Sequence, residues 1–279
     1  MRDGLEEDTA EPRRPRLTYP FEVTPEPGSG EAVEVAPGVL WLRQPLGGSL
    51  QFINVWALAD GDGWALVDTG IQTHESAQAW RAAFKGALGG FGKAIYQLPD
   101  SYRRMEDGDT FEIGGRLWRV VTGNGHSPEH ACLYCPELKL LISGDQVLPR
   151  ISSNVSVFPT EPDADPLTDW ITSCAKLKAA VPDEVLVLPA HNDPFHGLHA
   201  RLDHLIGGHE RSLGRLEKLL AKERKRAVDV FGALFARPID GGLLGMATGE
   251  SLAHINCLIH RGRAVREVDS DGVAWHRAV

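Results

Sequence analysis

Hydrophobic residues in the first two thirds of the chain come in short runs that are broken by turn signals, a pattern typical of paired β-strands. Pro37-Gly38 and Asp60–Gly63 are the clearest turns, and each has an apolar run on both sides. Similar hairpins are expected around Gly114-Gly115 and Pro136-Glu137. The strands that this pattern predicts are Val33–Val35, Val39–Leu42, Gln51–Ala59, Trp64–Val67, Thr110–Ile113, Leu117–Val121, Leu133–Tyr134, Leu138–Ile142 and Glu184–Leu188.

Longer segments carry apolar residues at intervals of three and four, which predicts amphipathic helices. They are His74–Leu88, Pro166–Ala180 and Leu198–Lys225. Asp165 is placed to cap the second helix, and Pro166 suits its first position, where an N–H would have no helical partner.

The end of the chain has a different order of elements. Short helical pieces lead into a helix at Ser251–Arg261, which is followed by two small strands, Ala264–Val268 and Val273–His276. A helix that feeds a small hairpin is the outline of a winged helix-turn-helix. We therefore expect a separate C-terminal unit.

Composition is that of a globular protein: 279 residues, 42% of them hydrophobic, with a net charge of −9. No apolar run approaches the roughly 18–20 residues of a membrane span. The first ten residues lack the apolar core of a secretory signal, and four cysteines are too few for a disulfide scaffold. These features predict a cytoplasmic protein without a membrane partner.

Charge separates the end of the chain from its body. Residues 199–279 carry 13 basic and 10 acidic side chains, whereas the rest carries 16 and 28. So small a basic excess is not expected to track nucleic-acid phosphates. Residues 1–30 contain five prolines and are expected to form a poorly ordered tail, with Tyr19–Val23 docked on the body. We expect the two domains at residues 31–204 and 205–279.

Candidate chemistry lies in three polar residues that follow strands. His126 comes after Leu117–Val121, Asp145 follows the next strand pair in Ser-Gly-Asp, and His191 comes after Val185–Leu188. A sheet fixes the direction of such side chains, while the adjoining loops leave them open to substrate. Two imidazoles and a carboxylate are suitable ligands for zinc.

The order of these residues, behind Asp68-Thr69-Gly70, resembles the metallo-β-lactamase superfamily between about Ala32 and His191. The resemblance implies an αββα sandwich, a mixed α/β (α+β) fold. It also implies two zinc ions, with His126 on the first, His191 on the second and Asp145 bridging both. Asp68 and His130 would support the metal site without ligating. From about Leu205 the chain resembles the winged-helix domain of some members.

One signature motif of that family, HxHxDH, is absent. It would lie between Asp68 and His126, which are only 58 positions apart, and no two of the eleven histidines are separated by one residue. The strand that carries the motif, and the helices after it, are expected to be missing as a block, which makes the sandwich incomplete. Exposed apolar surface or a disordered connection is then expected at Leu88–Ser101.

Possible substitute ligands are His130, His196 and the pair Cys132 and Cys135. Cys132 and Cys135 have the CxxC spacing, but positions three apart on a strand face opposite sides. His196, His199, His204 and His209 are spaced so that they spread around a helix, and we expect them to be exposed to solvent.

The resemblance implies a zinc-dependent hydrolase of esters, thioesters, lactones or lactams, acting on a small-molecule substrate. In that chemistry zinc lowers the pKa of its bound water to about 7. Without HxHxDH, each metal keeps one histidine and a shared aspartate, so we expect weak zinc binding and impaired or absent activity. The alternative is a non-catalytic interaction module that uses the winged helix, with His254, Asn256, His260 and Arg261 facing outward. A homodimer through this domain is a further expectation.

Overall fold

Two β-sheets pack face to face in the computed structural model, which describes residues 16–48, 50–89, 103–236 and 238–279. The first sheet is antiparallel, in the order β1 (Val33–Ala36), β2 (Val39–Pro45), β3 (Phe52–Asp60) and β4 (Gly63–Val67). The second has the order β5 (Thr110–Ile113), β6 (Arg116–Gly123), β7 (His130–Cys135), β8 (Leu140–Gly144) and β9 (Leu186–Pro189). Its strands are antiparallel except for β8 and β9, which run parallel.

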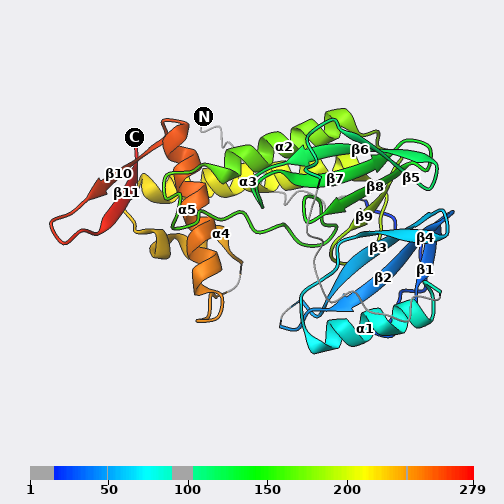
Figure 1. The fold of residues 1–279 in the computed structure, drawn as a ribbon. Helices are drawn as coiled ribbons and strands as arrows, with labels where there is room; N and C mark the ends of the chain where they lie inside the picture. The colour runs from blue at the N-terminus through cyan, green and yellow to red at the C-terminus, as the bar shows by residue number, and fades with distance from the viewer. Residues whose placement is uncertain (1–15, 49, 90–102, 237) are drawn as a thin grey trace, which may run out of the picture.

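Helices cover the outer faces of both sheets (Figure 1). Helix α1 (His74–Lys85) packs against the first sheet, and α2 (Pro166–Ala180) with α3 (Leu198–Leu220) covers the second. The layers are therefore helix, sheet, sheet, helix, and the expected αββα sandwich is confirmed.

Successive side chains of a strand point to opposite faces of its sheet, and both faces of these sheets are buried. Apolar residues therefore occur at neighbouring positions of one strand. On β2, Val39 and Trp41 face the core between the sheets, whereas Leu42 faces α1. On β7, Cys135 faces the core between the sheets and Cys132 faces the helical layer. The two cysteines thus lie on opposite faces as expected, and both are free thiols.

The first three helices begin where the sequence predicts. Asp165 caps α2 by accepting a hydrogen bond from the Thr168 amide at 3.1 Å, as its position predicts. Thr73 caps α1 in the same way. Helix α1 ends at Lys85 rather than Leu88, and α3 ends at Leu220 rather than Lys225.

The C-terminal unit contains η1 (Ala227–Val230), α4 (Phe231–Leu234), α5 (Leu244–His260) and the antiparallel pair β10 (Ala264–Val268) and β11 (Ala274–Ala278). It shares one apolar cluster with α2, α3 and the outer face of the second sheet. None of the helices in the described ranges is long and apolar enough to cross a membrane.

Packing of α5 corrects half of the expected outward face of the C-terminal helix, since His260 and Arg261 are exposed as expected. The helix also begins at Leu244 rather than at Ser251. His254 and Asn256 are buried, and the Asn256 amide donates to the backbone carbonyls of Pro162 and Ala164. The cause is that α5 packs against α2, against α3 and against the segment that precedes α2.

His209 is also buried, which contradicts the expectation of solvent exposure. It lies on the apolar stripe of α3, four residues from both Leu205 and Leu213, and this stripe packs into the core. His196, His199 and His204 are half-buried.

The described part of the expected N-terminal tail contacts the body. Thr18 forms a β-bridge with His196, and Leu17 and Phe21 pack against the core. Residues 1–15 of that tail, and the expected connection from residue 90 to 101, lie outside the described residues.

Candidate functional site

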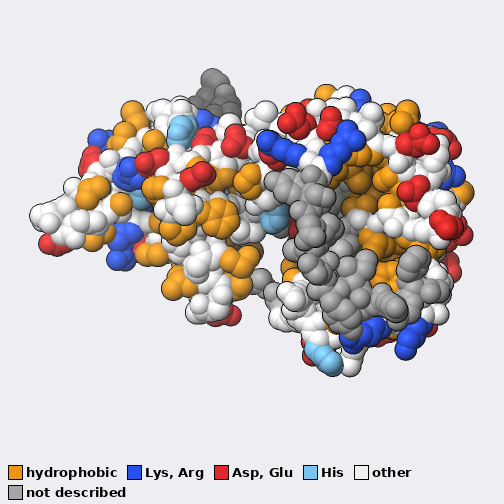
Figure 2. Space-filling view, in the orientation of Figure 1, with side chains coloured by type: hydrophobic (Ala, Val, Ile, Leu, Met, Phe, Trp, Pro, Cys, Tyr) orange, Lys and Arg blue, Asp and Glu red, His pale blue; other side chains and the backbone are white. Residues whose placement is uncertain are grey.

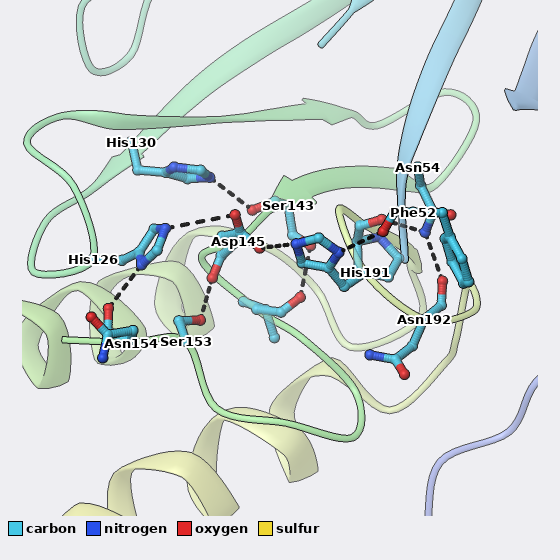
Figure 3. A network of polar contacts seen from close by, with 12 residues as sticks. Phe52, Asn54, His126, His130, Ser143, Asp145, Ser153, Asn154, His191 and Asn192 are labelled. Carbon is cyan, nitrogen blue, oxygen red and sulfur yellow. Dashed lines mark hydrogen bonds and ion pairs between the residues drawn. The ribbon is translucent and has the colours of Figure 1, made fainter. Parts of the chain in front are cut away.

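The side chains of His126, Asp145 and His191 meet at one edge of the second sheet (Figure 3). His126 follows β6, Asp145 follows β8 and His191 follows β9. The Nε2 atom of His126 lies 3.6 Å from Oδ2 of Asp145, and Nε2 of His191 lies 3.5 Å from Oδ1. Each histidine thus faces a different oxygen of the central carboxylate.

Backbone carbonyls orient both imidazole rings. Nδ1 of His126 lies 2.8 Å from the carbonyl oxygen of Asn154, and Nδ1 of His191 lies 3.1 Å from that of Phe52. Because a carbonyl only accepts, both Nδ1 atoms carry the proton and donate it. When the rings are neutral, each Nε2 therefore presents a lone pair toward Asp145, which is the orientation of a metal-ligating histidine.

Neighbouring residues hold the backbone of Asp145. The hydroxyl of Ser153 donates to its carbonyl oxygen. Gly144, just before it, has a φ of +51° and lies so close to the ring of His130 that a Cβ atom would collide with it. This position therefore favours glycine, for its backbone conformation and above all for the space beside His130.

The two predicted supporting residues are placed differently. His130 lies beside His126, with ring centroids 6.2 Å apart, and its Nε2 is 3.2 Å from the carbonyl oxygen of Ser143. Asp68 is exposed, has a φ of 66°, and accepts hydrogen bonds from the amides of Thr69 and Gly70. Its carboxylate stabilises its own turn.

Asn54 anchors the loop that carries His191, a role that the sequence reading missed. Its amide nitrogen donates to the carbonyls of Pro189 and Asn192, at 2.9 and 2.6 Å. Its oxygen accepts from the indole of Trp41 at 2.8 Å. A lone asparagine inside the apolar strand QFINVWALA was the available signal, since a buried amide needs partners.

Protonation at the cluster follows from burial and from the central charge. The contact with Asp145 raises the pKa of His126, although burial opposes this shift. Burial would raise the pKa of Asp145, but the contact with His126 and the neighbouring histidine charges lower it overall. Burial lowers the pKa of His130, which keeps this ring neutral at pH 7.

Zinc provides a chemical test of this donor set. Donors on a tetrahedral zinc with bonds of about 2.0–2.1 Å stand about 3.3 Å apart, close to the two histidine–carboxylate distances here. Each pair therefore matches one edge of a zinc site in chemistry and spacing.

The number of donors, however, is too small. Catalytic zinc usually has three protein ligands. Within the described ranges, no group of three or more His, Cys, Asp or Glu side chains is arranged to hold a metal ion. All eleven histidines and all four cysteines lie within these ranges. The residues present do not fit a tightly held catalytic zinc.

Comparison with known proteins gives matches over both parts of the chain. The profile of the metallo-beta-lactamase superfamily matches residues 82–191. The profile described as metallo-beta-lactamase-like, C-terminal domain, matches residues 213–279. The crystal structure of a beta-lactamase domain protein from Burkholderia ambifaria is 35% identical, with a TM-score of 0.87, over 94% of this chain and 97% of that one.

Curated relatives match over shorter stretches. Atrochrysone carboxyl ACP thioesterase from Aspergillus fumigatus is 26% identical over 186 residues, which are 56% of this chain and 41% of that protein. Hydroxyacylglutathione hydrolase from Ruegeria pomeroyi is 27% identical over 137 residues, which are 47% of this chain and 51% of that protein. The chain thus spans about half or less of the length of these relatives.

Proposed function

Since the chain belongs to the metallo-β-lactamase superfamily, which includes hydrolases, we propose that it descends from a thioester hydrolase. Its own zinc-dependent activity is strongly impaired. The observation that carries this proposal is the divided donor set. His126 and His191 face opposite oxygens of Asp145, and neither pair has a third donor among the described residues.

Thioesters are the substrate class that two of the curated relatives favour. Their names describe removal of an acyl group from a thiol carrier, an acyl carrier protein in one and glutathione in the other, whereas three further relatives are named only lactamase-like proteins. The substrate here is accordingly an acyl thioester, with the acyl carbon brought to the edge where His126 and Asp145 meet.

The chain's own residues supply binding and orientation at this edge. The carbonyls of Asn154 and Phe52 fix the two rings, and Asp145 carries a negative charge between them at neutral pH. What the cluster lacks is the electrophile that would polarise the acyl carbonyl, because two donors per ion hold zinc weakly. We therefore expect substrate binding without efficient turnover.

Turnover on matched substrates tests this proposal. Hydrolysis of an ester, a thioester and a lactam with the same acyl group should be at or near background, and His126→Ala should leave the rates unchanged. His196→Ala is a matched control, because His196 also contacts a backbone carbonyl through Nδ1 but belongs to the Thr18 bridge. Robust turnover that His126→Ala abolishes and His196→Ala preserves would contradict the impairment.

A further inference from the structure

A cavity of about 620 Å³ lies between α3, α5, residues 234–236 and 239–243, and residues 150–154. Its volume falls in the range of about 300–1,000 Å³ that is typical of small-molecule sites. Hydrophobic side chains gather over α4 and α5 on the face drawn in Figure 2. The apolar lining includes Leu205, Leu234, Phe235, Ile239, Leu243 and Ala247.

One wall of this cavity also holds the candidate site. Ser152 and Asn154 line the cavity, whereas Ser153 between them donates to the carbonyl of Asp145. The backbone carbonyl of Asn154 accepts from His126, and its side-chain amide donates to Glu250 at 3.3 Å. The cavity and the cluster therefore lie on opposite sides of residues 152–154.

The polar end of the cavity offers hydrogen bonds rather than free charge. Burial lowers the pKa of His209 to about 3 and of His254 to about 4, and raises that of Glu250 to about 7. Both imidazoles are thus neutral at pH 7, and Glu250 is about half protonated. Of the cations, Arg201 donates to the carbonyls of Leu148 and Ile151, and Arg150 pairs with Asp193.

We propose that this cavity binds the acyl chain of the thioester substrate, an uncharged aliphatic or aromatic group. The inference rests on the proposed function for the thioester itself. The apolar wall matches an acyl chain and does not match the polar carrier, whose amides would lose their hydrogen bonds with water there. Asn154 belongs both to the cavity wall and to the contact with His126, so an acyl chain in the cavity would lie next to the cluster.

A series of N-acetylcysteamine thioesters with butanoyl, hexanoyl and octanoyl groups tests the proposal on the full chain. Equilibrium binding is measured by calorimetry after chelation of metals, so that the thioesters stay intact. Burial of each methylene is expected to tighten binding by about three- to fourfold. Equal affinities across the series would overturn the proposal.

Two glycines of α3 provide a matched pair of variants. Gly208 lines the cavity, and a Cβ atom there would meet only the end of the Arg211 side chain, at 4.0 Å. A Cβ atom at Gly214 would meet nothing within 4 Å, and Gly214 is not part of the lining. Both positions therefore have room for a Cβ atom.

Gly208→Trp is expected to fill the cavity and weaken octanoyl binding at least tenfold, while Gly214→Trp binds like the wild type. Equal binding by the two variants would contradict the assignment, and the wild-type series decides the question even if Gly208→Trp misfolds. Because binding is measured without metal and without turnover, its outcome is independent of the impairment proposed above. A protein that is inactive and poor in zinc, as proposed above, but binds the series without chain-length dependence would refute the cavity assignment alone.

Discussion

Replacement of Glu250 by glutamine should stabilise the protein relative to the wild type, and this stabilisation should be larger at high pH than at low pH. Glu250 lies in the wall of the cavity on α5, and its side chain accepts a hydrogen bond from Asn154. Burial raises its pKa from 4.5 to about 7, so the folded protein retains a proton that the unfolded chain releases. Stability from this group is present below pH 4.5 and is lost as the pH rises to 7.

The magnitude follows from the size of that shift. A raise from 4.5 to about 7 corresponds to at most about 3 kcal/mol of unfolding free energy, and water in the cavity reduces this figure. Glutamine keeps an oxygen for Asn154 and does not ionise. Between pH 5 and pH 8, the unfolding free energy of Glu250→Gln relative to the wild type should rise by about 1–3 kcal/mol.

Urea denaturation at pH 5, 6, 7 and 8, followed by tryptophan fluorescence, measures this difference. Glu210→Gln is the matched control, because the contact with Arg261 lowers the pKa of Glu210. Loss of that carboxylate should destabilise the protein as the pH rises through the acid range, the opposite sign. A difference for Glu250→Gln that does not change with pH would refute the reasoning.

Three further predictions concern the core. The rings of His209 and His254 contact each other in the core, and both pKa values lie below the ordinary 6.5. The unfolding free energy should therefore decrease as the pH falls from 7 to 4. In urea denaturation, His209→Gln should show a weaker pH dependence than the wild type. Asn54→Ala should lower the unfolding free energy by about 2–4 kcal/mol, since buried partners lose their hydrogen bonds; an effect below 0.5 kcal/mol would contradict the anchoring role. The four buried thiols should react with a thiol reagent only after unfolding, since burial raises the pKa of Cys132 and of Cys174 to about 12; rapid labelling of the folded protein would refute this.

Local patterns in the sequence predict the strands well, whereas the layer order was implied by the family resemblance. Turns such as Asp60–Gly63 and caps such as Asp165 depend on residues next to each other in the chain, so they can be read directly. The direction of His126, Asp145 and His191 also follows from their places at strand ends.

Long-range packing accounts for what the sequence reading missed. His209 continues the apolar stripe of α3, but only the position of α5 shows that a second histidine, His254, completes its hydrogen bonding. Asn54 and the loop that it anchors are more than 130 residues apart. The partners of such buried polar groups depend on the assembled fold.

The central claim is that the cluster around Asp145 holds zinc only weakly, and zinc content tests it most directly. The protein is loaded with excess zinc, dialysed against metal-free buffer and analysed by elemental analysis, with His126→Ala in parallel. The account predicts clearly less than one zinc per chain in the wild type and still less in His126→Ala, because each half of the cluster has two donors. Two zinc ions per chain that survive dialysis would contradict it and would mean that other residues complete both sites.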